Sequence, residues 1–271
     1  MLHGLFGDAD NLRGLGARLG TAREVHRPNL PAHGGRAATD PLDLPSLARA
    51  VADDVAAVAR AAGAPVHLLG HSLGGKVAMA IAGLESAPAL ASLTVLDIAP
   101  KPYPPHHAPL IEALLGLDLD AVGSRREADA ALAARIPEPG VRAFLLKGLE
   151  RAAGPGGPAL RWRFDLGRIA RDYPHLAAAP PAAAASPLPV LLLYGADGDY
   201  VDPATDAPLV AARFPNARLE PVAGAGHWLH AERPEAVAEA CARHLAAVDA
   251  TAPGSTDATP DGAMDGATDD A

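Results

Sequence analysis

The stretch of sequence that decides the fold is VHLLGHSLGGK, residues 66–76. A short buried strand is predicted over Val66–Leu69, and a helix is predicted from about Gly75 to Leu84. Between them lies Gly-x-Ser-x-Gly, centred on Ser72. A turn this tight admits only small residues beside the serine, strains its backbone and presents Oγ at the end of the sheet, near the positive end of a helix dipole. This context, more than the five-residue pattern itself, makes Ser72 the candidate nucleophile.

Outward from this turn, short apolar runs alternate with longer helical patterns. This alternation predicts an α/β fold with a mostly parallel sheet and helices on both faces. Further strands are predicted over 93–98, 190–194 and 217–222, and further helices over 44–62 and 234–248.

The alternation stops between residues 99 and 187. Residues 108–176 are predicted as several helices, with breaks at Pro137, Pro139 and the glycine–proline stretch 154–158. We therefore expect a core made of residues 1–99 and 188–249 and a helical cap inserted over 100–187. Residues 250–271 are acidic and have nothing to bury, so this tail is predicted to be disordered.

The amino-acid composition of the chain argues against several classes of function. The 271 residues suit one large domain with an insertion, and 49% of them are hydrophobic. The net charge of −9 comes largely from the tail, and no Lys/Arg-rich patch exists, so no nucleic-acid partner is expected. The uncharged stretch 176–196 contains four prolines, which argues against a membrane span. With one cysteine, Cys241, and no signal-peptide pattern at the N-terminus, a cytoplasmic location is predicted.

Three motifs together resemble the α/β-hydrolase superfamily. They are Ser72 within GHSLGGK, His3-Gly4 within LHGLFGD, and His227 within GAGHW. The segments LHGLFGDADNL (2–12), VLDIAPKPY (95–103) and RWRFDL (161–166) are similar, more narrowly, to small bacterial carboxylesterases of the YbfF type. The resemblance covers about residues 1–248. It implies a serine hydrolase in which a histidine and a carboxylate activate the serine.

Eleven histidines compete for the role of base. In this fold the catalytic residues follow the order Ser, acid, His along the chain. His227 follows the last predicted strand in a glycine loop, which is where the resemblance places the base. His230 is expected on the next turn, and His71 is expected to point away from Ser72.

The acid has three candidates. The common family position lies three residues after Gly195, but Gly198 occupies it, so the flanking Asp197 and Asp199 are alternatives. Asp97 ends the strand after the elbow helix, where an unpaired buried carboxylate would be costly. The resembling esterases use the Asp of this segment, and Asp97 is therefore favoured.

The resemblance also suggests the oxyanion hole and the pocket. Two backbone N–H groups are needed; Leu73 is expected to supply one and Leu5 the other, with Phe6 as second choice. His3 is expected to brace the loop. The sequence has few aromatic residues, and those near the expected pocket are more often packing residues. Phe6, Trp162 and Trp228 are nevertheless candidates for lining the pocket.

These features predict a cofactor-independent carboxylic-ester hydrolase with an acyl-enzyme intermediate. No metal or dinucleotide motif is present in the sequence. Thioesterases, lactonases, carbon–carbon bond hydrolases, haloperoxidases and acyltransferases share the same residues, and a non-catalytic ligand-binding member is the alternative from another class. The substrate and the oligomeric state do not follow from the sequence.

The position of LHGLFGD near the first residue carries a further expectation. In the fold that the chain resembles, this loop follows a central strand, and two more strands precede that one. Only Met1 and Leu2 come before it here. Because a central gap leaves buried backbone groups unpaired, the native start is predicted to lie upstream by about 15–25 residues, enough for three strands.

Overall fold

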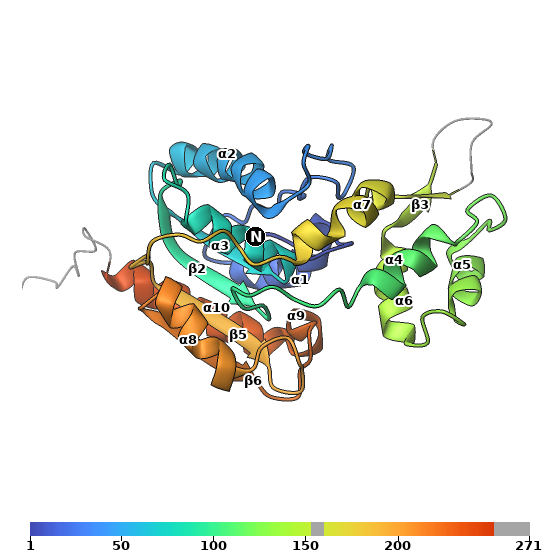
Figure 1. The fold of residues 1–271 in the computed structure, drawn as a ribbon. Coiled ribbons are helices and arrows are strands. Elements are labelled where there is room, and N and C mark those ends of the chain that lie inside the picture. Colours follow the sequence, from blue (N-terminus) through green and yellow to red (C-terminus); the bar gives the residue numbers. More distant parts are fainter. Residues whose placement is uncertain (153–159, 252–271) are drawn as a thin grey trace, which may run out of the picture.

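The computed structural model describes residues 1–152 and 160–251. The predicted break at 154–158 and residues 252–271 of the predicted tail lie outside these ranges. Within them, Figure 1 shows a sheet with its covering helices and, to one side, a group of helices with a small hairpin. No helix in the described ranges is long and apolar enough to cross a membrane.

The main sheet is parallel, as predicted. Its four strands are β1 (Val66–His71), β2 (Leu90–Leu96), β5 (Val190–Gly195) and β6 (Ala217–Val222). They lie in the order β1-β2-β5-β6. Since parallel strands align their carboxyl ends, the residues after β1, β2, β5 and β6 all meet at one edge of the sheet.

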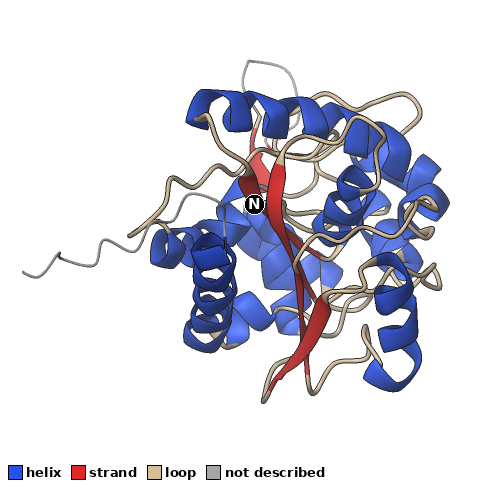
Figure 2. Cartoon of the chain, turned by 90° about the vertical axis from the view of Figure 1, so that its left-hand side faces the viewer, coloured by secondary structure: helices blue, strands red, loops and turns tan. Residues whose placement is uncertain are grey.

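Helices cover both faces of this sheet, and Figure 2 shows the twisted strands between them. On one face lie α2 (Leu44–Ala62), α3 (Leu73–Ala82) and α8 (Pro203–Arg213). On the other lie α1 (Arg13–Leu19) and α10 (Pro234–Thr251). Side chains alternate between the two cores: Leu192 packs toward the first face, while Leu191 and Leu193 pack toward the second. This two-sided burial explains why β5 is almost entirely apolar.

The loop that follows His3-Gly4 is attached to the free edge of β1. Leu2 forms a parallel bridge with Gly70. Its N–H donates to the Leu69 carbonyl at 2.8 Å, and its carbonyl accepts from the His71 N–H at 3.0 Å. After the loop come a short 3₁₀ helix, η1 (Ala9–Leu12), and α1.

The inserted cap contains the predicted helices and one element that was not predicted. The helices are α4 (Ala108–Leu115), α5 (Arg125–Leu132), α6 (Pro139–Lys147) and α7 (Leu166–Ala177). Between α6 and α7, β3 (Leu149–Arg151) pairs with β4 (Leu160–Trp162) in an antiparallel hairpin. Each strand has three residues and buries one leucine, too short a run to show the alternation by which strands are recognised.

Candidate active site

The turn around Ser72 has the strained geometry expected of a nucleophile elbow. Ser72 has a φ of 51° and directly precedes α3. A Cβ on Gly70 would lie 2.2 Å from the Gly74 carbonyl oxygen, and a Cβ on Gly74 would lie 2.4 Å from that of Leu2. Both positions therefore require glycine, and the contact between Gly74 and Leu2 also places the loop that follows Leu2 directly beside the elbow.

His227 connects Ser72 with Asp97. It lies in the loop between β6 and the short helix α9 (Leu229–Glu232). Its Nε2 lies 3.0 Å from the Ser72 Oγ, and its Nδ1 lies 2.7 Å from an oxygen of the Asp97 carboxylate. With the proton on Nδ1, the imidazole donates to Asp97 and accepts from the serine hydroxyl, the arrangement that general-base activation needs.

Asp97 is fixed by the ends of two neighbouring strands. It directly follows β2, has a φ of 50°, and donates its own N–H to the Leu193 carbonyl of β5 at 2.8 Å. The Gly195 N–H donates to the carboxylate oxygen that does not face His227, at 2.9 Å. Burial raises the pKa of Asp97 to about 7, whereas the Gly195 hydrogen bond opposes this rise by stabilising the charged form.

The ring of His227 is surrounded by the rings of three aromatic residues, Tyr200, His71 and Trp228. Tyr200 stacks on it, with ring centroids 3.6 Å apart and planes inclined by 15°. The His71 Nε2 lies 2.8 Å from the His227 carbonyl oxygen, so His71 positions the backbone of His227. Burial lowers the pKa of His227 to about 3, which keeps the imidazole neutral at neutral pH. His230 lies on α9, the next turn.

The two alternative acids, Asp197 and Asp199, lie in the loop after β5. Both are exposed to solvent. Among the described residues, neither carboxylate forms a hydrogen bond or ion pair with His227. Asp199 acts at longer range, because its negative charge raises the pKa of both His227 and Asp97.

The loop after His3-Gly4 brings Leu5 to the nucleophile. Leu5 and Ser72 line the same cavity, and Leu73 lines a second cavity together with both. Within the described ranges, the N–H groups of Leu5 and Leu73 have no hydrogen-bond acceptor. The Phe6 N–H, the second choice for the oxyanion hole, is already engaged, because it donates to the His33 Nε2 at 3.2 Å.

His3 braces this loop from inside. Its Nε2 accepts from the Leu30 N–H at 3.1 Å, and it is buried. Desolvation lowers its pKa to about 3, so it is neutral and able to accept that hydrogen bond. The ring therefore connects the loop to the segment that leads into α2, away from the reacting atoms.

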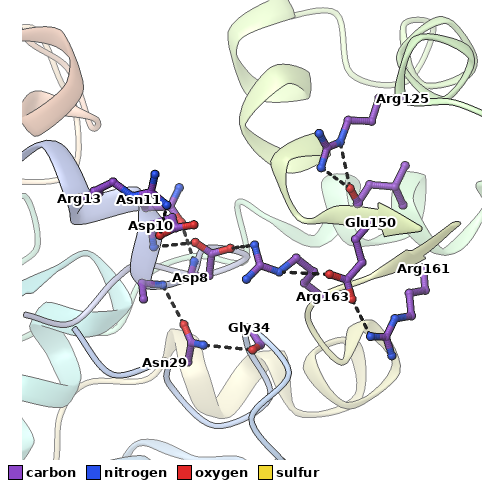
Figure 3. A network of polar contacts seen from close by, with 12 residues as sticks. Asp8, Asp10, Asn11, Arg13, Asn29, Gly34, Arg125, Glu150, Arg161 and Arg163 are labelled. Carbon is purple, nitrogen blue, oxygen red and sulfur yellow. Dashed lines mark hydrogen bonds and ion pairs between the residues drawn. The ribbon is translucent and has the colours of Figure 1, made fainter. Parts of the chain in front are cut away.

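A polar network fixes the far end of the same loop, and Figure 3 shows it from close by. The Asp8 carboxylate accepts from the Asp10 N–H at 2.9 Å and pairs with Arg163 of the cap at 2.7 Å. The Asn29 side chain accepts from the Ala9 N–H at 2.8 Å. The loop is thus tied to the core on one side and to the cap on the other.

Two cavities meet at Ser72. The larger, of about 230 Å³, is lined by residues that include Phe6 and Trp228. The smaller, of about 40 Å³, lies toward α7. The expectation for Trp162 was wrong, because its ring stacks on Phe164 at 5.1 Å and lines neither cavity. Trp162 lies on the hairpin, which the sequence did not reveal, and the hairpin turns this ring toward Phe164.

A buried lysine, Lys76, lies beside the elbow and was not predicted from the sequence. Lys76 lies in α3, is 3% exposed and lines the smaller cavity. Its Nζ donates to the carbonyl oxygens of Ala177 and Ala178, at 2.8 and 2.7 Å, and lies 4.7 Å from the centre of the Tyr103 ring. Lys76 therefore attaches the end of α7 to the elbow helix. The only sequence signal was its charge in an otherwise apolar helix.

The order of the strands, the elbow at the end of β1 and the inserted cap define the alpha/beta hydrolase class of fold. Residues 1–240 match the model of the alpha/beta hydrolase family. The chain belongs to this family.

Similar proteins agree with this assignment. The chain is 32% identical to "Esterase YbfF" of Escherichia coli, over 90% of this chain and 91% of that protein. It is 31% identical to "sn-1-specific diacylglycerol lipase ABHD11" of Xenopus laevis, over 86% of this chain and 74% of that protein. A solved structure, "Marine microorganism esterase", has 29% identity and a TM-score of 0.81, covering 90% of this chain and 93% of that one.

Proposed function

We propose that this protein hydrolyses carboxylic esters through an acyl-enzyme on Ser72. The observation that carries the proposal is the placement of one imidazole, His227, between the Ser72 hydroxyl and the buried Asp97 carboxylate, at 3.0 and 2.7 Å. These distances suit proton transfer on one side and orientation of the ring on the other. The relatives named esterase and lipase support the same class of reaction.

In the first half of the reaction, Oγ of Ser72 attacks the ester carbonyl carbon while its proton moves to Nε2 of His227. The negative charge that develops on the carbonyl oxygen is stabilised by the free N–H groups of Leu5 and Leu73. Asp97 stabilises the imidazolium through Nδ1. His227 then gives its proton to the departing alcohol oxygen, and the acyl group remains on Ser72.

In the second half, a water molecule takes the place of the alcohol. Nε2 of His227 accepts a proton from this water, whose oxygen attacks the acyl carbon. The tetrahedral intermediate collapses, the Ser72 oxygen leaves with the proton from His227, and the carboxylic acid is released. No step involves a redox change, and His227 gives up each proton that it accepts, so it is neutral again at the end of the cycle.

The experiment that tests the proposal combines labelling with turnover. The full chain is treated with a fluorophosphonate and analysed by mass spectrometry, with a panel of p-nitrophenyl esters and acyl-CoA thioesters assayed in parallel. We expect the label on Ser72 and turnover of the oxygen esters. Labelling with faster thioester turnover would replace the proposal by a thioesterase, and the absence of both labelling and turnover would favour a ligand-binding member of the family.

A further inference from the structure

Two loops beside the nucleophile are joined to each other by a pair of buried histidines. In one direction, the Nε2 of His3 accepts from the Leu30 N–H at 3.1 Å. In the other direction, the Nε2 of His33 accepts from the Phe6 N–H at 3.2 Å. Both histidines are only 1% exposed, and their ring centroids lie 5.3 Å apart. Each loop thus supplies one imidazole acceptor to a backbone N–H of the other loop.

Both imidazoles are neutral and carry their proton on Nδ1. Burial lowers the pKa of His3 to about 3 and that of His33 to about 4. Because each Nε2 accepts from an N–H group, the single ring proton lies on Nδ1. The Nδ1–H of His3 donates to the Gly4 carbonyl, and that of His33 donates to the Pro31 carbonyl, both at 2.9 Å. All four ring nitrogens are therefore used, and each ring has one preferred orientation.

These contacts set the direction of the Leu5 N–H. The Gly4 carbonyl and the Leu5 N–H belong to one planar trans peptide group, so they point in opposite directions. The carbonyl is held on the side of the His3 ring and also accepts from the Gly7 N–H at 3.1 Å. The Leu5 N–H therefore points away from this ring, which leaves it free to donate to a developing oxyanion.

His33 holds the next peptide group, between Leu5 and Phe6. These two residues are the centre of the turn that the Gly7 N–H closes. Phe6 has a φ of 60°, a left-handed conformation that glycine usually adopts at this position of a turn. A strained residue of this kind persists only where its surroundings enforce the conformation. The hydrogen bond to His33 does so, because a Phe6 N–H turned away from Nε2 would be buried without an acceptor.

The cap holds the loop that carries His33. The Gly35 N–H donates to the Arg163 carbonyl at 2.9 Å, and the Asp165 N–H donates to the Ala32 carbonyl at 2.8 Å. Both cap residues lie in the segment between β4 and α7. Since the two backbone hydrogen bonds flank His33 in the sequence, the position of this imidazole depends on the position of the cap.

The same segment of the cap also contacts the turn directly. Its central residue, Phe164, packs its ring against the ring of Phe6, with centroids 5.4 Å apart. Phe164 is buried, and neither Phe164 nor His33 lines a cavity at Ser72. Replacing Phe164 or His33 therefore tests the placement of the turn without removing a contact to the substrate.

We infer that the cap helps to form the oxyanion hole, and that His33 is the positioning residue that connects the cap to the turn of Leu5 and Phe6. This inference rests on the proposed ester hydrolysis. It goes beyond that proposal because it gives the cap a part in stabilising charge as well as in covering the site. A change in the contact between the cap and this loop should then affect stabilisation of the oxyanion more than binding of an uncharged ligand.

The decisive measurement compares two inhibitors with the same carbon chain, 1,1,1-trifluorooctan-2-one and octan-2-one. The Ser72 Oγ adds to the carbonyl carbon of the fluorinated ketone, its proton moves to His227, and the carbonyl oxygen becomes an oxyanion. Octan-2-one binds without this addition. His33→Phe keeps an aromatic ring but removes the acceptor at Nε2. Inhibition constants for both ketones and kcat for p-nitrophenyl acetate are measured with the full chain.

We expect His33→Phe to weaken inhibition by the fluorinated ketone about tenfold or more and to lower kcat by a similar factor. The inhibition constant of octan-2-one should change less than about threefold, since it needs no oxyanion hole. An equal loss for both ketones, or no loss for either, would overturn the inference and leave ester hydrolysis intact. A wild-type chain that neither hydrolyses the ester nor is inhibited by the fluorinated ketone would contradict the proposed function itself.

His33→Gln is the conservative variant. Its side-chain amide oxygen can accept a hydrogen bond in place of Nε2, so its inhibition constant for the fluorinated ketone should stay within about threefold of the wild-type value. A loss in His33→Gln as large as that in His33→Phe would show that the acceptor at Nε2 does not hold the turn.

The part played by the cap is tested with Phe164→Leu, and this comparison also serves if His33→Phe does not fold. It should weaken inhibition by the fluorinated ketone about threefold or more and leave octan-2-one almost unchanged. Phe214→Leu is the matched control, because Phe214 is equally buried but follows α8 in the core. It should leave both inhibition constants unchanged. Equal effects of the two variants would show that the core as a whole, and not the cap, places the oxyanion hole.

Discussion

The strand ends and the cap interface fix their side chains by different means. At the strand ends, Ser72 and Asp97 are buried, with backbone positions set by hydrogen bonds to neighbouring strands. At the cap interface, ion pairs add to the apolar packing, as between Arg163 and Asp8 or Arg168 and Asp40. Ion pairs contribute little free energy where both partners are exposed, whereas the backbone at a strand end is fixed by hydrogen bonds of the sheet. The residues proposed to carry out the chemistry therefore lie at the strand ends, and the cap that covers them is joined to the core in part by ion pairs.

The largest effect should come from the nucleophile. Ser72→Ala removes the oxygen proposed to attack, and His227→Ala removes the proposed base, so each should lower kcat by about 10⁴–10⁶. Activity on p-nitrophenyl acetate and thermal unfolding are measured together. Ser86→Ala, at an exposed serine, is the control and should match the wild type. More than a few per cent residual activity in Ser72→Ala would exclude Ser72 as the nucleophile.

The second-largest loss of activity should come from replacing Asp97, the proposed acid. Asp97→Asn keeps the shape of the side chain but no longer selects the imidazole tautomer, and about 10⁴ in kcat should be lost. Asp197→Asn and Asp199→Asn are natural controls, since both carboxylates are exposed, and each should cost less than about threefold. A large loss at Asp197 or Asp199 with Asp97→Asn near wild type would transfer the role of acid to that residue.

The dependence of kcat/KM on pH should reflect the protonation of the buried pair Asp97 and His227. Burial raises the pKa of Asp97 to about 7 and lowers that of His227 to about 3, so the first proton that the pair takes up binds near pH 7. The reaction needs the carboxylate and the neutral imidazole. Hence kcat/KM should be half-maximal near pH 7, reach its plateau about one pH unit higher, and fall about tenfold per pH unit well below pH 7. An acid limb with its midpoint below pH 5 would contradict this.

The variant Asp199→Asn tests the electrostatic origin of this pH dependence. The charge of Asp199 raises the pKa of both members of the pair, so Asp199→Asn should move the acid limb to lower pH while leaving the plateau almost unchanged. Asp197→Asn, on the other side of Gly198, is the matched control. An unchanged limb in Asp199→Asn would show that this charge is fully screened by solvent.

A modest effect should come from the ion pairs of the cap interface (Figure 3). Arg163→Met leaves the Asp8 carboxylate, whose side chain is only 10% exposed, without its ion pair. The loss of unfolding free energy should be about 1–2 kcal/mol. Activity should fall about two- to fivefold, far less than the roughly 10²–10³ that a lost oxyanion donor costs, because the Leu5 N–H is only loosened.

Arg161→Met is the matched control for this interface. Arg161 is 61% exposed and pairs with Glu150 at the surface, so its loss should cost about 0.5 kcal/mol or less. Urea unfolding and kcat/KM are measured for both variants. Equal effects in the two would show that Asp8 does not need its ion pair to place the loop.

Several features of the fold and site followed from local patterns. The apolar run Val190–Tyr194 predicted a strand and became β5, and glycine beside Ser72 predicted the turn that the structure contains. Both depend on contacts within a few residues, and such contacts leave a trace in the sequence. The hairpin β3–β4 was missed because each strand is short, and so the expectation that Trp162 lines the pocket was wrong.

The pattern of residues around Ser72 was enough to predict an elbow, a parallel sheet and a histidine after the last strand, because backbone sterics and hydrophobic periodicity are local. Only the folded chain shows that Asp97, of the three carboxylates, contacts His227, since this contact depends on β2 and β5 ending side by side, with the Gly195 N–H directed at Asp97. The same holds for the two cavities, whose walls come from the core and the cap. Their unequal volumes depend on how side chains distant in sequence pack together, and no local pattern encodes that packing.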